Sequence, residues 1–260
     1  MKIKTFFSQA YLYHKGRRAA FAAEEFILHE IGYPLVTLIF YCLLASYSFN
    51  TQDLTSWVIG NAFLLCTNVC VFRLGHVFDG ERYFGRLRSI IASPCKKLPL
   101  ILANGLFPAM FAIAASSCGL IVGAVIFGVD FSHVNIALVA LTIVCAMFSA
   151  TCFGLLLSMV GLITDSMHLV LNIVSYLLMI FTGAEFPISQ LPLIGRIISQ
   201  LMPLTKAIAA MNTLFDSHSE SFWMLIIAEL ITGAVYAIMA RLLFGFAERQ
   251  ARRNGRFDLF

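Results

Sequence analysis

Charged side chains are scarce in this sequence. They make up 12% of its 260 residues, whereas soluble globular domains carry about 25%. Hydrophobic residues account for 60% of the chain, which is too many for an ordinary soluble domain. The net charge of +4 predicts no nucleic-acid partner, because the basic residues are sorted by membrane topology, as described below. The composition therefore predicts an integral membrane protein.

Motifs for chemistry within the chain are also missing. There is no phosphate-binding G-x-x-x-x-G-K-[ST] loop. The seven cysteines form no C-x-x-C pair, and the six histidines are scattered, so no metal site or disulfide framework is expected. A membrane-embedded enzyme would need His, Asp or Glu clustered at one depth, and the spans offer Glu229 alone. The sequence predicts a non-enzyme without a cofactor of its own.

Long apolar runs dominate what is present. A helix needs about 20 residues to cross the hydrocarbon of a bilayer. Six runs are expected to cross, and together with their connections they form one transmembrane domain over 31–260. They are 31–49, 54–78, 99–129, 134–163, 168–184 and 221–246. Within the third, Gly119 and Gly123 form a G-x-x-x-G pattern, which predicts close helix packing.

The distribution of Lys and Arg predicts the orientation. With the N-terminus inside, sixteen of the eighteen basic residues fall on the inner side, and only Arg196 and Lys206 fall outside. Cytoplasmic loops carry such an excess. Both termini are therefore expected in the cytoplasm, including the basic tail 247–260.

The only long charged interruption within the apolar part of the chain is the loop 79–98. Its portion 81–91 has apolar residues at a spacing of three to four, which predicts a short amphipathic helix. Pro94 is expected to end this helix, because proline disfavours the α region for the residue before it. A helix in this place could press on a soluble partner.

The segment 1–30 is also amphipathic, with aromatic and aliphatic residues among basic and acidic ones. This pattern is typical of a helix that lies in the membrane interface against the lipids. The alternative is a soluble cytoplasmic tail.

The outer segment 185–206 is too apolar for a solvated loop and is interrupted by Pro187, Pro192 and Pro203. A short helix is expected over 194–202, and part of another over 186–191. The pattern favours a segment that re-enters the outer leaflet, where surrounding protein or a water-filled cavity can satisfy irregular backbone. The alternative is an interfacial hairpin without a role.

Two carboxylates stand out. Glu229 lies inside the sixth span, and a carboxylate at such a position is costly enough to suggest function. It could face a transport cavity or pair with a donor on another span. Glu185 is expected at the outer mouth, exposed to water, and is a candidate for an outer gate.

Two motifs resemble those of the type-2 ABC exporter permeases, the membrane subunits of bacterial ATP-binding-cassette exporters. The first is ERYFGRLRSIIASP, residues 81–94, which is similar to the family's pattern of a charged residue, a Gly, a Leu and a small residue before Pro. The second is GAEFPISQLP, residues 183–192, followed by Met202-Pro203-Leu204-Thr205. Arg88 departs from the pattern, since many members have an acidic residue there.

The resemblance implies an all-α fold with six transmembrane helices, an N-terminal interfacial helix, a cytoplasmic coupling helix and an extracytoplasmic re-entrant segment. It implies a half-transporter in the bacterial cytoplasmic membrane, a dimer with a second copy, and a separate ATPase subunit that binds ATP and Mg²⁺. Coupling would involve Glu81, Arg82, Phe84, Gly85, Arg86, Leu87, Arg88 and Pro94. The outer gate would involve Glu185, Phe186, Pro187, Leu191, Pro192, Pro203 and Leu204.

The predicted function is export of an amphiphilic substrate, such as a drug, an antimicrobial peptide, a lipid or a lipid-linked glycan. The alternative is a secondary transporter driven by an ion gradient. That class often has internal repeats with broken helices in both halves. Here no repeat is visible, and the broken segment occurs in one half only. The partner copy could be identical or a paralogue.

Overall fold

The computed structural model describes residues 7–8, 10–12, 15, 28, 32–51, 53–83, 85, 97–161, 164, 166–215 and 221–254. The described residues form helices and turns without a strand, as the sequence predicts. The helices that build the bundle are α3 (Tyr33–Phe49), α4 (Thr55–Cys66), α5 (Arg73–Gly75), α8 (Lys97–Phe127), α9 (Ile136–Val160), α10 (Met167–Phe181) and α13 (Phe222–Asn254).

Four stretches of helix are long and apolar enough to cross a membrane. They are Thr55–Gly75, Gly105–Phe127, Ile136–Val160 and Phe222–Phe246, and each lies in a predicted span. The other two predicted spans correspond to α3 and α10, which are apolar helices of 17 and 15 residues. Length and composition therefore support four of the six predicted crossings.

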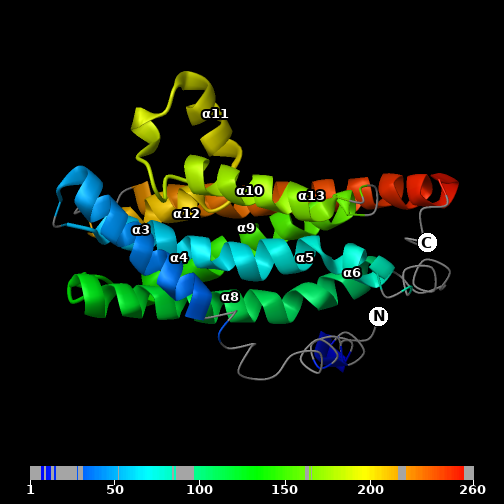
Figure 1. The fold of residues 1–260 in the computed structure, drawn as a ribbon, viewed down its shortest axis with the longest axis horizontal. Helices are drawn as coiled ribbons and strands as arrows, with labels where there is room; N and C mark the ends of the chain where they lie inside the picture. Colours follow the sequence, from blue (N-terminus) through cyan, green and yellow to red (C-terminus); the bar gives the residue numbers. More distant parts are fainter. Residues whose placement is uncertain are drawn as a thin grey trace.

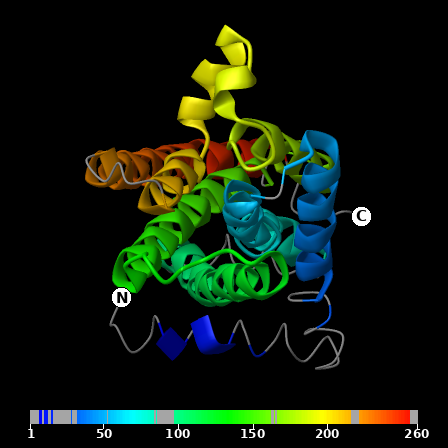
Figure 2. The ribbon, with the colours of Figure 1, turned by 90° about the vertical axis from the view of Figure 1, so that its left-hand side faces the viewer.

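The second span occupies the centre of the bundle. Buried residues make up 82% of an 18-residue window within Thr55–Gly75, compared with 22% of one within Phe222–Phe246. In Figures 1 and 2, α4 and α5 lie among α3, α8, α9 and α10. The main core forms around Val58, Ile59, Ala62 and Phe63 of α4. α3, α8, α9 and α12 (Thr205–Phe215) thus pack against α4, whereas α13 packs against α9 and α12.

Glycine allows α8 to approach α4 closely. A Cβ atom at Gly123 would lie 2.1 Å from the Val58 side chain, and one at Gly119 would lie 2.7 Å from Leu65. Real Cβ atoms do not approach other heavy atoms so closely, so a larger residue at either position would require the neighbouring side chain to shift. The expectation that the G-x-x-x-G pattern packs against a neighbouring helix is confirmed.

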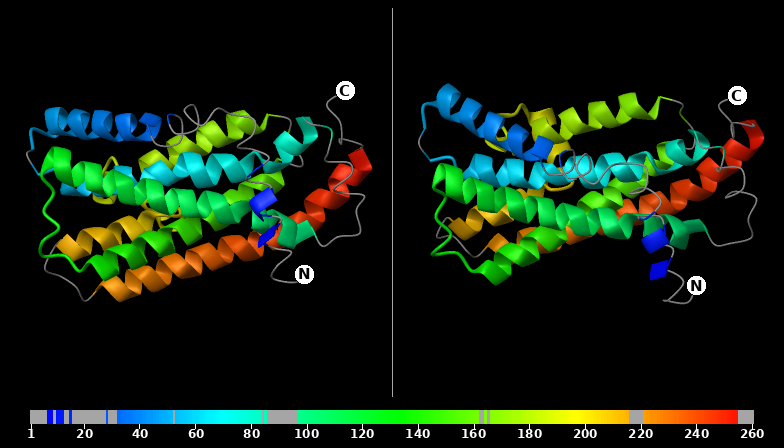
Figure 3. Two further views of the ribbon diagram at one scale, coloured as in Figure 1. Left: turned by 90° about the horizontal axis from the view of Figure 1, so that it is seen from below. Right: turned by 60° about the horizontal axis from the view of Figure 1, so that its bottom comes forward.

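Local sequence sets several helix ends. Pro34 lies in the first turn of α3, as predicted, where its missing N–H costs nothing. The Asn135 side chain caps α9 by accepting a hydrogen bond from the Ala137 amide at 3.0 Å. The α8–α9 and α3–α4 connections lie at one end of the bundle, and α6 (Val77–Tyr83) lies at the other (Figure 3).

The second span is not a uniform α-helix over 54–78. A π-helical segment, η2 (Thr67–Phe72), follows α4 and leads into the short α5. α5 ends at Gly75, and α6 begins at Val77 after a turn at His76. The helix is thus interrupted at His76, two residues before the predicted inner boundary at residue 78, which stays a prediction.

The two ends of the chain are described only in part. Most of 1–30 lies outside the described residues, so the interfacial helix stays a prediction. At the other end, α13 continues to Asn254 without interruption. The predicted tail 247–260 thus begins as the last turns of a helix, and residues 255–260 lie outside the described part.

Candidate functional site

The outer segment leaves the bundle and returns to it. After α10, a short 3-10 helix, η3 (Ile188–Gln190), is followed by α11 (Leu193–Leu201). The helix predicted over 194–202 is therefore confirmed. In Figures 1 and 2, α11 stands away from the other helices at the top of each view. Its outward side chains are apolar, with Leu193, Ile194, Ile197 and Leu201 exposed.

Side chains hold this segment in shape. The Arg196 guanidinium donates to the Leu191 carbonyl at 2.9 Å and to the Ser189 carbonyl at 2.5 Å, which ties η3 to α11. The Tyr236 hydroxyl of α13 donates to the Leu201 carbonyl at the end of α11. The projecting segment is therefore braced both internally and against the sixth span.

Glu229 holds the point where the chain turns back into the bundle. Its Oε1 atom accepts a hydrogen bond from the Leu204 amide at 2.8 Å and another from the Ser149 hydroxyl of α9. Leu204 has a φ of 71°, a left-handed conformation that is uncommon outside glycine. The next residue, Thr205, begins α12 (Thr205–Phe215), whose N-terminus favours a nearby negative charge.

The Glu229 side chain is fully buried, at 0% exposure, and lines neither of the two cavities described below. The sequence left two alternatives for Glu229, a position facing a transport cavity or a pairing with a donor elsewhere in the chain. The geometry shows the second. The Lys206 ammonium lies near this turn. It donates to the Gln200 carbonyl at 2.5 Å and to the Thr232 hydroxyl at 3.1 Å. Polar groups of α9, α12 and α13 thus surround the turn at Leu204.

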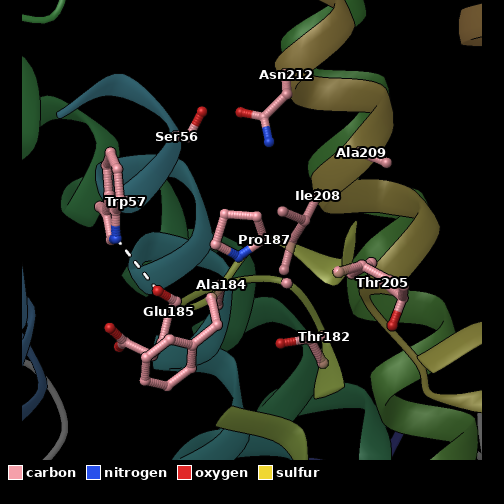
Figure 4. A pocket seen from close by; sticks show the side chains of 13 residues that line it. Ser56, Trp57, Thr182, Ala184, Glu185, Pro187, Thr205, Ile208, Ala209 and Asn212 are labelled. Atoms are coloured by element: carbon pink, nitrogen blue, oxygen red, sulfur yellow. Dashed lines mark hydrogen bonds between the residues drawn. The ribbon is translucent and has the colours of Figure 1, made fainter. Parts of the chain in front are cut away.

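Glu185 lies where α10 gives way to the outer segment, pressed against α4. The indole of Trp57 donates to the Glu185 carbonyl at 3.2 Å (Figure 4). A Cβ atom at Gly60 would lie 2.5 Å from the Ala184 Cα, so the two backbones touch. The expectation that Glu185 is exposed to water is wrong, since its side chain is only 7% exposed. Close approach of the backbone at Gly60 encloses it.

The environment of Glu185 changes its ionisation. It lies outside the membrane spans, and burial raises the pKa of its carboxyl to about 7. A hydrogen bond from the Asn61 side chain acts in the opposite direction and is the smaller effect. The Oε1 atom is buried and has no hydrogen-bond partner among the described residues.

Two cavities meet at Glu185. One, of about 260 Å³, lies between α4, the turn after α10, and α12, and includes Trp57, Pro187 and Ile208 (Figure 4). The other, of about 240 Å³, lies between α3, α4 and α10. In Figure 4 the Glu185 carboxylate points away from Asn212 and Ile208, which line the first cavity only.

The remaining predicted gate residues are spread along the outer segment. Phe186, Pro187 and Pro192 are exposed, and Leu191 is partly buried. Pro203 and Leu204 are buried at the base of α12. Glu185, Pro203 and Leu204 are thus the members buried against the bundle, whereas the others lie on the projecting part.

The predicted coupling segment is described only at its start. Glu81 is buried in α6, which also contains Arg82, and Gly85 is exposed with a φ of 66°. A single helix over 81–91 is wrong, because α6 begins at Val77 and ends at Tyr83. The left-handed Gly85 is typical of a residue that follows a helix end. Phe84, Arg86, Leu87, Arg88 and Pro94 lie outside the described residues.

Sequence reasoning missed several residues of this region. It assigned no element to α12 and gave no role to Trp57, Asn61, Ser149 or Tyr236. Asn61 could have been noticed, since a polar side chain inside an apolar span needs a partner. Within the described part, no group of three or more His, Cys, Asp or Glu side chains is placed to hold a metal ion.

Comparison with protein families identifies the family to which this chain belongs. The family model described as ABC-2 type transporter matches residues 12–215, which include both motifs and all of the outer segment. The chain belongs to the ABC-2 type transporter family. A search of curated proteins gave no match. This ABC-2 protein is therefore the permease part of an ABC transporter, and its family implies association with an ABC ATPase subunit.

Proposed function

We propose that this ABC-2 permease exports an amphiphilic substrate from the cytoplasm or the inner leaflet of a bacterial cytoplasmic membrane. The observation that supports this most is the conjunction of family membership with a braced outer segment that meets the bundle at Glu185. Substrates of this class include drugs, antimicrobial peptides, lipids and lipid-linked glycans.

In this proposal all six predicted spans cross the membrane. α3 has 17 residues, which is the lower limit of the range for a crossing helix. α10 has 15 residues, and the residues that follow it up to 184 provide the remaining length. The Lys and Arg distribution then places both termini in the cytoplasm.

Two copies would form the transport path. α10 exposes Asn172 and Tyr176, and α3 exposes Tyr33, on the side where these helices line the second cavity. Polar side chains on a lipid-facing surface are costly, so a second copy or water is the better neighbour. A homodimer satisfies this requirement with a single gene product, and lipids would contact the remaining surface.

The partner ATPase would supply the energy. It would bind ATP and Mg²⁺, and the segment formed by Glu81, Arg82, Phe84, Gly85, Arg86, Leu87, Arg88 and Pro94 would contact it. The outer segment from Glu185 to Leu204 would close the path towards the outside, in part by re-entering the outer leaflet.

The test is affinity purification of the full chain from its native host in mild detergent, followed by mass spectrometry. We expect a stoichiometric soluble protein with a phosphate-binding loop. The variant Leu87→Asp should lose this protein while it still inserts in the membrane. The control Arg253→Asp changes charge in the predicted cytoplasmic tail and should retain it. Absence of the ATPase from the wild-type preparation would reject the proposal.

A further inference from the structure

The cavity between α3, α4 and α10 has an unusual lining for a membrane protein. More than half of the side chains around it carry a polar atom, although the helices themselves are apolar. The polar residues of this lining on which the following argument depends are Tyr41, Asn61, Thr67, Asn172, Ser175 and Glu185. All of these except Glu185 lie within predicted spans, where polar side chains are expected to face protein, water or a transported molecule.

The buried oxygens of this cavity need a donor. Glu185 is buried, with 7% of its surface exposed. Its Oε1 atom has no hydrogen-bond partner within the described part of the chain. The Thr67 hydroxyl is buried in the same wall and also has no described partner. A buried acceptor that makes no hydrogen bond costs free energy, so these atoms are suited to a ligand that donates.

The charge of the lining narrows the class of ligand. Among the described residues that line the cavity, Glu185 is the only carboxylic acid, and there is no Lys or Arg. The aromatic rings of Tyr41 and Tyr176 belong to the same lining, and aromatic faces attract cations. Ammonium and guanidinium groups are donors without acceptors and therefore match this set.

We infer that the cavity between α3, α4 and α10 receives the cationic group of the transported amphiphile, with Glu185 as its counter-charge. This inference rests on the proposed export function and adds a substrate class to it. The apolar part of the molecule would contact the surrounding residues, such as Leu64 and Met179.

The inference predicts a pH effect with a known sign. A carboxyl with a pKa of about 7 must lose its proton to pair with a cation, so protons and ligand compete. For a ligand of permanent charge, affinity should be about tenfold weaker at pH 6 than at pH 8. Tyr41 and Cys42 of α3 lie near Glu185, and both types ordinarily titrate above pH 8. Tyr33 of α3 and Tyr176 of α10 also line the cavity.

The experiment measures equilibrium binding to the full chain in lipid nanodiscs by fluorescence polarisation. The probes are ethidium, an amphiphile of permanent positive charge, and Nile red, an uncharged one. We expect ethidium binding that weakens about tenfold from pH 8 to pH 6. Glu185→Gln should weaken ethidium binding at pH 8 at least tenfold and abolish its pH dependence, while Nile red binding stays unchanged.

The matched control is Asp130→Asn, which removes an exposed carboxylate from the α8–α9 connection, outside both cavities. It should leave both probes unaffected. If Glu185→Gln fails to fold, the pH dependence of ethidium binding to the wild-type chain still tests the inference. Absence of ethidium binding, or binding that is equal at both pH values, overturns the inference. Co-purification of the ATPase in those cases shows that the export proposal survives on its own.

Discussion

The amide of Leu204 donates a hydrogen bond to the Glu229 carboxylate at 2.8 Å while Leu204 itself has a φ of 71°. A left-handed conformation costs about 1–2 kcal/mol for a residue with a side chain. A hydrogen bond of this kind contributes about 0.5–1.5 kcal/mol, which offsets part of that cost. The sixth span thereby fixes the turn that begins α12.

Replacement of this acceptor should loosen the turn. In Glu229→Leu the Leu204 amide stays buried without an acceptor, which costs about 1–3 kcal/mol. We expect a lower melting temperature in detergent, measured by intrinsic fluorescence. An unchanged or higher melting temperature would show that Glu229 contributes little to this turn.

The serine on the other side of Glu229 provides a controlled comparison. Ser149 and Ser158 are both fully buried in α9, and each donates to the carbonyl three residues earlier. Only Ser149 also donates to Glu229. Ser149→Ala should therefore lower the melting temperature more than Ser158→Ala, and equal effects would contradict the Ser149–Glu229 contact.

The close approach of α4 to the outer segment predicts a steric effect. Gly60→Ala places a Cβ atom 2.5 Å from the backbone of Ala184, which should destabilise the protein by about 1–3 kcal/mol. Gly105→Ala is the control, because its Cβ would have its nearest neighbour at 3.4 Å. Thermal unfolding of the two variants should separate them, and similar melting temperatures would argue against the contact.

The pKa of Glu185 predicts how stability depends on pH. Because burial raises its pKa from the ordinary value to about 7, the folded state binds a proton that the unfolded state releases. This contribution is present below about pH 4.5 and is lost as pH rises towards 7 and above. Relative to Glu185→Gln, the wild-type protein should become less stable from pH 5 to pH 8, as thermal melts at each pH would reveal. A constant difference would contradict the raised pKa.

The brace at Arg196 predicts a local effect. Arg196→Gln removes hydrogen bonds to the Leu191 and Ser189 carbonyls on the exposed outer segment. Hydrogen exchange in a peptide covering 186–192 should become faster, while the global melting temperature stays the same, because these bonds link only neighbouring turns. Gln190→Ala is the control, since the same peptide keeps its Arg196 contacts. Equal exchange in both variants would reject the brace.

Sequence patterns predicted the helices better than their contacts. Apolar runs located the long helices α3, α4, α8, α9, α10 and α13, because burial in lipid or protein demands continuous apolar residues. They could not place Glu185, since its enclosure depends on Gly60 and Trp57, more than one hundred residues away in the chain. They also missed α12, because its packing against α4, α9 and α13 involves small residues such as Ala207 and Ala210 rather than a long apolar run.

The carboxylates show the same difference. The cost of burying Glu229 predicted a role for this residue. The sequence pattern could not show whether its carboxyl faces a cavity or pairs with a hydrogen-bond donor. The partner is a backbone amide, and no side-chain pattern in a sequence reports which amide lies nearby. The helix break at Gly85 was likewise hidden, since a glycine within an amphipathic pattern permits either continuation or a left-handed turn.

The π-helical segment Thr67–Phe72 bears on how the second span tolerates changes of length. A π-helical turn contains one residue more than the α-helical turn it replaces. Deletion of a residue elsewhere in a helix rotates everything beyond it by about 100°, and α5 would then turn away from α9. A deletion within Thr67–Phe72 removes the surplus residue and restores a regular helix. We therefore expect single-residue deletions that arise in the second span to be accepted there and rejected on either side.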